Sequence, residues 1–404
     1  MADLDNFRAE VGEWLDANAP QSLRGVQVTA ERGGTWGGRR ATFEPPDMKP
    51  WLQMCIEKGW TAPSWPSEYG GGGLSSEAAK LLAGEMRKRR LPPPLTGFGL
   101  SMIGPTLLRY GTEEQKQQHI RKIVRGEIRW CQGYSEPDAG SDLASIQTRA
   151  VRDGDDFILN GQKVWTSYGD LSDWIFALVR TDPKVKKQEG ITFILIDMET
   201  PGVSVRPIKL ISGKSPFCET YFDDVRVPVK NVIAEINGGW TVAKALLRDE
   251  RSMIADVFGS VADTGKQRKP GSMLANLARQ YLGGADGTML SDPVLRDEIA
   301  RCELDDKAFA LTVQRTRDAA KAGHQSGPES SIFKVYATEL NKRRSELMVD
   351  IAGPEGLGWE GTGFDKDELA RTRGWLRARG NSIEGGTSEV QLNIIAKHVL
   401  GLPD

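Results

Sequence analysis

Hydrophobic positions recur with a helical period in the first third of the chain. Residues 1–20 carry an apolar stripe that ends at Pro20, and the stripe consists of Leu4, Phe7, Val11, Trp14 and Leu15. Residues 76–90 begin with a serine cap and contain a run of strong helix formers. Pro- and Gly-rich stretches at 62–75 and 91–97 separate the periodic segments. This pattern predicts a mostly helical domain over residues 1–128.

The pattern changes to short apolar runs from about residue 129. The run 156–167 contains Asn160-Gly161, a dipeptide typical of two-residue turns, which predicts a hairpin at this point. Further runs, separated by turn residues and without intervening helices, cover 174–180, 191–198, 203–210 and 220–228. Closely spaced strands of this kind favour antiparallel pairing. A β domain is therefore predicted over residues 129–237.

Long helical periods return after residue 238. They cover 237–262, 293–323, 330–353 and 388–401. Several long antiparallel helices are typical of a bundle. The predicted fold class is therefore α+β, with an N-terminal all-α domain, a middle antiparallel β domain, and a C-terminal four-helix bundle over residues 238–404.

Composition and charge exclude several classes of protein. The 404 residues are 39% hydrophobic and 27% charged, and the net charge of −2 gives no sign of binding to nucleic acid or to an anionic membrane. No apolar run is long enough to span a bilayer, and the N-terminus does not resemble a secretory signal. Four scattered cysteines indicate a reducing compartment, so we expect a cytoplasmic protein.

The sequence contains few residues that could support catalysis by histidine or by a bound metal. The three histidines lie at positions 119, 324 and 398, and we expect each to be a surface or capping residue. No cysteine pair has the short spacing of a zinc site, and no metal is expected.

Candidate chemistry concentrates where the helical block meets the β block. Residues 133–145 read GYSEPDAGSDLAS, and a second segment, Lys163-Val164-Trp165-Thr166-Ser167, follows. Small residues allow close approach of the backbone, and exposed N–H and O–H groups can bind a flat, polar cofactor that an aromatic side chain covers. The residues alone leave a second interpretation open, which is a structural hairpin with a buried tryptophan.

These two segments resemble signatures of the acyl-CoA dehydrogenase family. Residues 133–145 are similar to its first flavin-contacting segment and 163–167 to its second, while EGGTSEVQLNIIAKHVLG (384–401) is similar to its closing motif. The resemblance covers nearly the whole chain, and the order of the three blocks matches the family fold. It implies an FAD-dependent enzyme that oxidises an acyl-CoA thioester, passes electrons to an electron-transferring flavoprotein, and forms a homotetramer or a heterotetramer with a related chain.

The resemblance also implies roles for residues of the β domain. Ser135 and nearby backbone groups would hydrogen-bond the flavin ring, and Trp165 and Ser167 would lie against it. Ser141 would lie where the flavin pyrophosphate and the CoA pantetheine meet. The other cofactor-binding positions that it implies here are Tyr134, Gly140 and Thr166.

In the C-terminal block, the resemblance implies that Thr387 and Glu389 bind the ADP half of FAD. Arg279 is implied to reach the FAD of a neighbouring subunit. Gly386 and Arg251 are implied to contact the substrate, although Arg251 could instead stabilise the bundle.

Two carboxylates compete for the role of the base that removes the α-proton. A carboxylate suits this step when a dry pocket raises its basicity. Many family members carry the base as Glu-Gly-Thr in the closing motif, but residues 382–387 read SIEGGT, which places Gly385 at the usual base position and Glu384 one residue early. Some branches carry the base on a bundle helix directly before an arginine, and Glu250-Arg251 resembles that arrangement. Glu250 is therefore favoured, with Glu384 as the alternative, unless Glu250 only pairs with a cation on a solvated helix face.

Two other functions remain open at this point. The departure at Gly385 is compatible with a non-catalytic scaffold subunit of a heteromeric enzyme. The same fold could also support an oxidase or monooxygenase that uses O₂. No set of residues in the sequence indicates the length or type of the acyl group.

Overall fold

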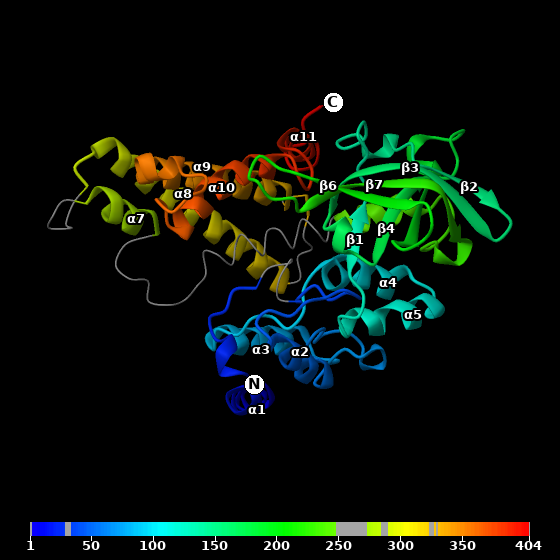
Figure 1. The fold of residues 1–404 in the computed structure, drawn as a ribbon, viewed down its shortest axis with the longest axis horizontal. Coiled ribbons are helices and arrows are strands. Elements are labelled where there is room, and N and C mark those ends of the chain that lie inside the picture. Colours follow the sequence, from blue (N-terminus) through cyan, green and yellow to red (C-terminus); the bar gives the residue numbers. More distant parts are fainter. Residues whose placement is uncertain are drawn as a thin grey trace. The chain divides into compact units, whose positions relative to one another are not determined.

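The computed structural model describes residues 2–28, 34–247, 273–283, 290–322, 327–328 and 330–403. These residues form two compact units, of which the first comprises Met1–Ile208 and Pro216–Leu246 and the second Lys209–Ser215 and Leu247–Asp404. Figure 1 shows the order of the helices and strands along the chain.

The first unit begins with helices, as the sequence predicts. They are α1 (Ala2–Asn18), α2 (Met48–Glu57), α3 (Ser76–Lys88), α4 (Gly104–Tyr110) and α5 (Glu113–Val124). The stripe of α1 is confirmed, because Val11 and Leu15 are buried against Trp51 of α2 and Leu82 of α3. The serine that caps α3 is Ser75, whose side chain accepts a hydrogen bond from the N–H of Ala78, rather than Ser76.

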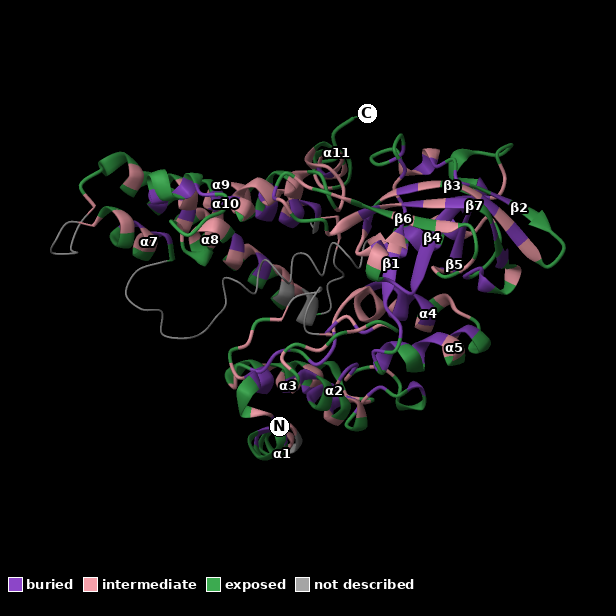
Figure 2. Ribbon diagram, in the orientation of Figure 1, coloured by how far each residue is buried: buried purple, intermediate pink, exposed green. Residues whose placement is uncertain are grey.

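A seven-stranded sheet follows these helices in the same unit. Its strands are β1 (Trp130–Gly133), β2 (Arg149–Asp153), β3 (Asp156–Ser167), β4 (Trp174–Arg180), β5 (Ile191–Asp197), β6 (Val203–Ile208) and β7 (Phe217–Pro228). The strand order is β1-β4-β2-β3-β7-β6, and β5 pairs with β4. The pairing is antiparallel except that β4 runs parallel to β1 and meets β2 at one parallel pair. Figure 2 shows that buried positions concentrate in β4 and the strands around it.

The hairpin predicted at Asn160-Gly161 is wrong. β3 runs through this dipeptide, and the hairpin turn lies earlier, between the paired residues Asp153 and Asp156. The Asn160 side chain instead exchanges two hydrogen bonds with Asp224 of β7, where the β3–β7 register shifts. Gly161 passes close to Thr148, since a Cβ on Gly161 would lie 2.6 Å from the Thr148 Cα. Between Leu159 and Gly161 β3 advances two residues while β7 advances three, from Val225 to Phe222, so the dipeptide lies inside a strand opposite a bulge of β7 and not in a turn.

One of the predicted surface histidines is buried. His119 of α5 is 2% exposed, and its ring packs edge-on against Trp130 and Trp174. His398 is exposed in the last turn of a C-terminal helix, and His324 lies outside the described residues. The prediction failed for His119 because the helical stripe of α5 faces the sheet, and the imidazole fills a position between two indole rings.

The second unit is helical. Its described helices are α7 (Met273–Leu282), α8 (Pro293–Lys321), α9 (Ser330–Ala352), α10 (Lys366–Ala378) and α11 (Ser388–His398). Leu274, Ile299 and Ile351 belong to one apolar cluster that joins α7, α8 and α9. The fold class is thus confirmed as helical, then mostly antiparallel sheet, then helical. Among the described residues, no helix is long and apolar enough to cross a membrane.

Candidate functional site

A loop at residues 134–148 connects β1 to β2 and carries the first candidate segment. Its beginning is a tight turn, because the N–H groups of Glu136 and Ala139 donate hydrogen bonds to each other's carbonyls at 3.1 and 3.0 Å. A 3-10 turn at Leu143–Ser145 shapes its second half. The loop is therefore a defined structure in which each exposed group has a fixed position.

The exposed side of this loop carries polar groups that a ligand can reach. Gly140 and Ser141 are exposed, Ser135 is half-buried, and no atom lies within 4 Å of where a Cβ on Gly140 would stand. Neither serine hydroxyl has a hydrogen-bond partner among the described residues. Tyr134 differs, because its ring is buried and packs edge-on against Phe176.

Trp165 has an unusual conformation for a tryptophan. Its side chain is 54% exposed, and its backbone has a φ of +62°. It lies in a bulge, because the β3–β7 register shifts between Lys163 and Thr166. Its ring meets Phe217 edge-on at 6.0 Å between centroids. An exposed indole held in a left-handed backbone indicates a surface for a flat ligand rather than a core position.

The neighbours of Trp165 differ from each other. Thr166 is fully buried, and its hydroxyl accepts a hydrogen bond from Thr220 at 3.1 Å, so its side chain is used by the fold. Ser167 is half-buried, and its hydroxyl has no partner among the described residues. Trp165 and Ser167 thus present side chains, whereas Thr166 offers only its backbone.

A buried ion pair connects the loop to β3. Lys163 Nζ lies 2.7 Å from Glu136 Oε1 and donates a second hydrogen bond to the Tyr134 carbonyl at 3.2 Å. Burial lowers the pKa of Lys163 to about 8, against the opposing effect of Glu136. For Glu136, burial raises the pKa, but Lys163 and the donors at Thr148 and Gln147 outweigh it, and the net pKa is lowered.

Sequence reasoning missed this pair, although a signal was present. Phe157, Leu159 and Lys163 alternate along β3 on its buried side, so the period of the strand directs the lysine inward. A charged residue on the buried face of a strand indicates a partner, because an unpaired charge is very costly to bury.

The C-terminal candidates lie in the second unit. Thr387 caps α11, and its side chain accepts a hydrogen bond from the N–H of Val390 at 3.2 Å. Glu389 stands in the first turn of α11, where the backbone N–H and the Thr387 hydroxyl lower its pKa. Gly386 has a φ of +90°. Arg279 of α7 donates a hydrogen bond to Asn276 at 2.8 Å, and it has further interactions.

Of the two candidate bases, Glu384 is the one that lies among the described residues. Its carboxylate receives hydrogen bonds from Arg377 at 2.6 Å and from Asn381 at 2.5 Å, and its side chain is 42% exposed. Glu250 and Arg251 lie outside the described residues.

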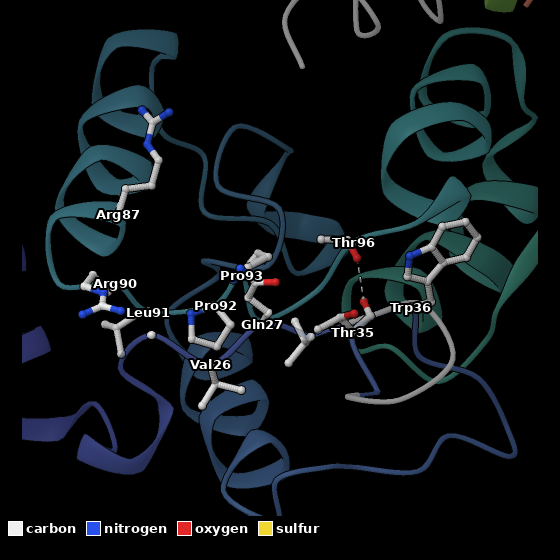
Figure 3. A pocket seen from close by; sticks show the side chains of 12 residues that line it. Val26, Gln27, Thr35, Trp36, Arg87, Arg90, Leu91, Pro92, Pro93 and Thr96 are labelled. Carbon is white, nitrogen blue, oxygen red and sulfur yellow. Dashed lines mark hydrogen bonds between the residues drawn. The ribbon is translucent and has the colours of Figure 1, made fainter. Parts of the chain in front are cut away.

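A cavity of about 550 Å³ lies among the N-terminal helices of the first unit. Figure 3 shows Thr96 donating a hydrogen bond to the Thr35 carbonyl on one side, with Arg87 and Arg90 on the other. Trp36, which lines the cavity, meets Tyr168 edge-on at 5.2 Å between ring centroids. None of the predicted site residues is among the described residues that line it.

The chemistry of the β-domain site fits a bound flavin. It combines one exposed aromatic ring, three hydroxyl groups without a described partner, and a glycine with open space, in two segments that a direct hydrogen bond joins. Such groups can cover the face of a flat ring and satisfy its polar edge.

Comparisons with known proteins agree with this fit. The chain matches the acyl-CoA dehydrogenase N-terminal domain at residues 27–127, the middle domain at 131–225 and the C-terminal domain at 237–400. It is 35% identical to the acyl-CoA dehydrogenase IpdE1 of Mycobacterium tuberculosis over 405 aligned residues, which cover all of this chain and 99% of that protein.

Solved structures give the same result. A structure described as the Tcur3481-Tcur3483 steroid ACAD has a TM-score of 0.74 and 30% identity, with 100% of this chain and 98% of that chain covered. The ChsE4-ChsE5 complex of Mycobacterium tuberculosis has a TM-score of 0.73 and 29% identity, with the same coverage. The chain belongs to the acyl-CoA dehydrogenase family. It is an FAD-dependent oxidoreductase that acts on acyl-CoA.

Proposed function

We propose that this chain converts an acyl-CoA thioester to the trans-2-enoyl-CoA. Bound FAD supplies the acceptor for the β-hydride. The protein's part is to hold the flavin against the β domain, to orient the thioester, and to remove the α-proton with a carboxylate. The observation that carries this proposal is the exposed Trp165 in its left-handed bulge, next to the uncommitted hydroxyl groups of Ser135 and Ser167.

We assign the binding roles as the sequence suggests, with two refinements. Ser135, Gly140, Ser141, Trp165 and Ser167 contact FAD or the thioester through exposed groups. Tyr134 and Thr166 contribute backbone groups, because both side chains are buried.

In the second unit we assign the ADP half of FAD to the α11 N-terminus, with Thr387 and Glu389, and to Arg279. The first turn of a helix favours negative groups through its free N–H donors, which suits a pyrophosphate. Gly386, with its positive φ, lets the backbone approach the substrate closely.

Glu250 is the favoured base. Both oxygens of Glu384 already receive hydrogen bonds from Arg377 and Asn381, and the side chain is substantially exposed. A general base for an α-proton needs a free oxygen within hydrogen-bond reach of the carbon in a pocket that excludes water. Glu384 would have to break its ion pair to meet this requirement.

A steroid-derived, polycyclic acyl group is the substrate class that we propose. The structure with the TM-score of 0.74 is described as a steroid ACAD, and this chain is 30% identical to it over its full length. Electron-transferring flavoprotein is the proposed acceptor, and the cytoplasm the proposed location.

A scaffold subunit is the second candidate. Two of the structural relatives are described with pairs of chains, Tcur3481-Tcur3483 and ChsE4-ChsE5. A heterotetramer with a related chain is therefore the alternative to a homotetramer. In this alternative the partner supplies the base, and Gly385 marks a base that this chain lacks.

The test is to purify the chain alone and in co-expression with a related chain, and to record the flavin spectrum during anaerobic addition of acyl-CoA thioesters. Bleaching with the chain alone supports the enzyme, and bleaching only after co-expression supports the scaffold. Rapid reoxidation of the bleached flavin by air would indicate an O₂-using enzyme instead.

A further inference from the structure

Lys163 is a fully buried cation whose bonds surround Ser135. Its ammonium bonds the Tyr134 carbonyl on one side of Ser135 and the Glu136 carboxylate on the other. The Ser135 carbonyl itself accepts a hydrogen bond from the N–H of Val164 at 2.9 Å. Three consecutive loop residues are therefore attached to two consecutive residues of β3.

The sheet ladder skips the two residues that follow Lys163. The ladder between β3 and β7 pairs Lys163 with Thr220 and resumes at Thr166 with Cys218. Val164 and Trp165 have no partner in the registered ladder. The described backbone contact of Val164 is the one to Ser135, so the backbone at Trp165 is tied to the loop, while its ring meets Phe217 of β7.

Glu136 extends the attachment to the far end of the loop. Its carboxylate also accepts hydrogen bonds from the N–H of Gln147 at 2.5 Å and of Thr148 at 2.9 Å. The carboxylate therefore holds both ends of the 136–148 segment, with Lys163 compensating its charge. Buried Arg180 supports the segment between them through the carbonyls of Ala144 and Ile146.

A buried ion pair often contributes little net stability to a fold. Apolar residues of similar volume often stabilise as well or better, because both charges must lose their hydration. The pair provides directional contacts that apolar side chains cannot provide, namely four hydrogen bonds that join the two charged groups to each other and to Tyr134, Gln147 and Thr148.

We propose that Lys163 and Glu136 form an internal strut that positions Ser135 and Trp165 for the flavin. They are positioning residues, because neither ammonium nor carboxylate is exposed to touch a ligand. The proposal rests on the proposed function in that the positioned ligand is FAD. The position of the loop itself does not depend on that function.

Four variants of the full chain test the strut. Lys163→Met removes the ammonium with little change in length, and Glu136→Gln removes the carboxylate charge. The double variant removes both charges of the pair, although it also removes the Glu136 charge that acts on the buried Arg180 guanidinium. Arg226→Met is the matched control, because it removes a 2.6 Å ion pair with Asp153 from the surface of the same sheet.

Three quantities are measured for each variant. They are hydrogen exchange of residues 134–148 before FAD is added, the Kd for FAD, and the melting temperature. We expect Lys163→Met and the double variant to show at least tenfold faster exchange in the loop and at least tenfold weaker FAD binding. The double variant should recover part of the melting temperature that Lys163→Met loses, without recovering FAD affinity. Arg226→Met should match the wild type.

A double variant with wild-type loop exchange and FAD affinity would overturn the proposal. Recovery of FAD affinity together with melting temperature would overturn it too, because the pair would then contribute only stability. An unfolded double variant, judged by circular dichroism, would show that the pair is needed for the fold and not for the position of the loop. If the wild type binds no FAD, the proposed function fails, and the exchange measurement still decides whether the strut exists.

Discussion

Glu384 is ion-paired with Arg377, seven residues earlier, at 2.6 Å between Oε2 and Nη2. Asn381 donates to the other carboxylate oxygen, and its own carbonyl oxygen accepts a hydrogen bond from Asn341 of α9. Glu384 thus belongs to a polar network that fixes the turn before α11. The next residue is Gly385, which the sequence resemblance places at the position of the family's usual base.

The first prediction concerns the base. Glu250→Gln should slow anaerobic flavin reduction by acyl-CoA about 10²–10⁴-fold, the range typical for loss of a general base. Glu384→Gln should stay within about tenfold of the wild type, because its carboxylate bonds Arg377. Stopped-flow absorbance at the flavin band measures both rates. The control is Glu346→Gln, which removes an exposed carboxylate that bonds Arg379 in the same unit. The reverse ranking of the two variants would transfer the role to Glu384.

A second prediction concerns Trp165. Aromatic pairs contribute about 0.5–1.5 kcal/mol beyond their buried area, so Trp165→Ala should raise the Kd for FAD roughly tenfold. The melting temperature without FAD should change little, because the ring is half exposed. Titration of FAD with detection by flavin fluorescence gives the Kd. Val151→Ala, which shortens an exposed apolar side chain on β2, serves as control. Equal affinities of wild type and Trp165→Ala would remove Trp165 from the flavin site.

A third prediction concerns pH. Burial lowers the pKa of His119 to about 4, with Lys122 adding to the effect and Asp197 opposing it. Between pH 6.5, the ordinary pKa, and about pH 4, His119 binds a proton in the unfolded chain but stays neutral in the folded chain. The contribution of His119 to the free energy of unfolding therefore falls as the pH drops through this window, by about 3 kcal/mol at about 1.4 kcal/mol per pH unit.

Urea unfolding of the wild type and of His119→Gln at pH 6.5, 5 and 4 measures this effect. The variant should lose less stability on acidification, although it is less stable at pH 6.5 because the ring packs between two tryptophans. Parallel pH profiles would show that His119 does not titrate in this way.

The elements that the sequence predicted correctly are those whose signal is local. The apolar stripe of α1 and the long periods of α8 and α9 are repeated many times within one element, so a single exception does not change the result. The recognition of the family rested on three short segments in the right order, and it too needed no knowledge of contacts.

The failures depend on contacts between distant residues. Asn160-Gly161 has the composition of a turn, but it pairs with β7, where Asp224, sixty-four residues later, bonds Asn160, and Gly161 passes close to Thr148, so the strand continues through it. His119 is buried because Trp130 and Trp174 come together in the parallel pair of β1 and β4, which no local pattern indicated. The Lys163–Glu136 pair likewise joins positions twenty-seven residues apart.

A fourth prediction tests whether the strand continues through Asn160-Gly161. Gly161→Ala should destabilise the first unit by about 1–3 kcal/mol, because its Cβ would collide with the backbone of Thr148. Gly154→Ala, in the observed turn, meets no atom within 4 Å, so it should cost only the roughly 1–2 kcal/mol of a left-handed backbone. Chemical denaturation gives both values. A larger loss for Gly154→Ala would contradict the position of the turn.

The central claim is that this chain holds FAD against the Ser135 and Trp165 segments and uses it to oxidise an acyl-CoA. The most direct measurement is the visible spectrum of the purified chain, reconstituted with FAD, during anaerobic titration with a steroid-derived acyl-CoA. The account predicts a bound flavin whose visible absorbance disappears as the thioester is added, and a Trp165→Ala variant that needs a higher FAD concentration to bind the flavin. A chain that stays colourless both alone and with a related chain, or a bound flavin that no acyl-CoA bleaches, would contradict it.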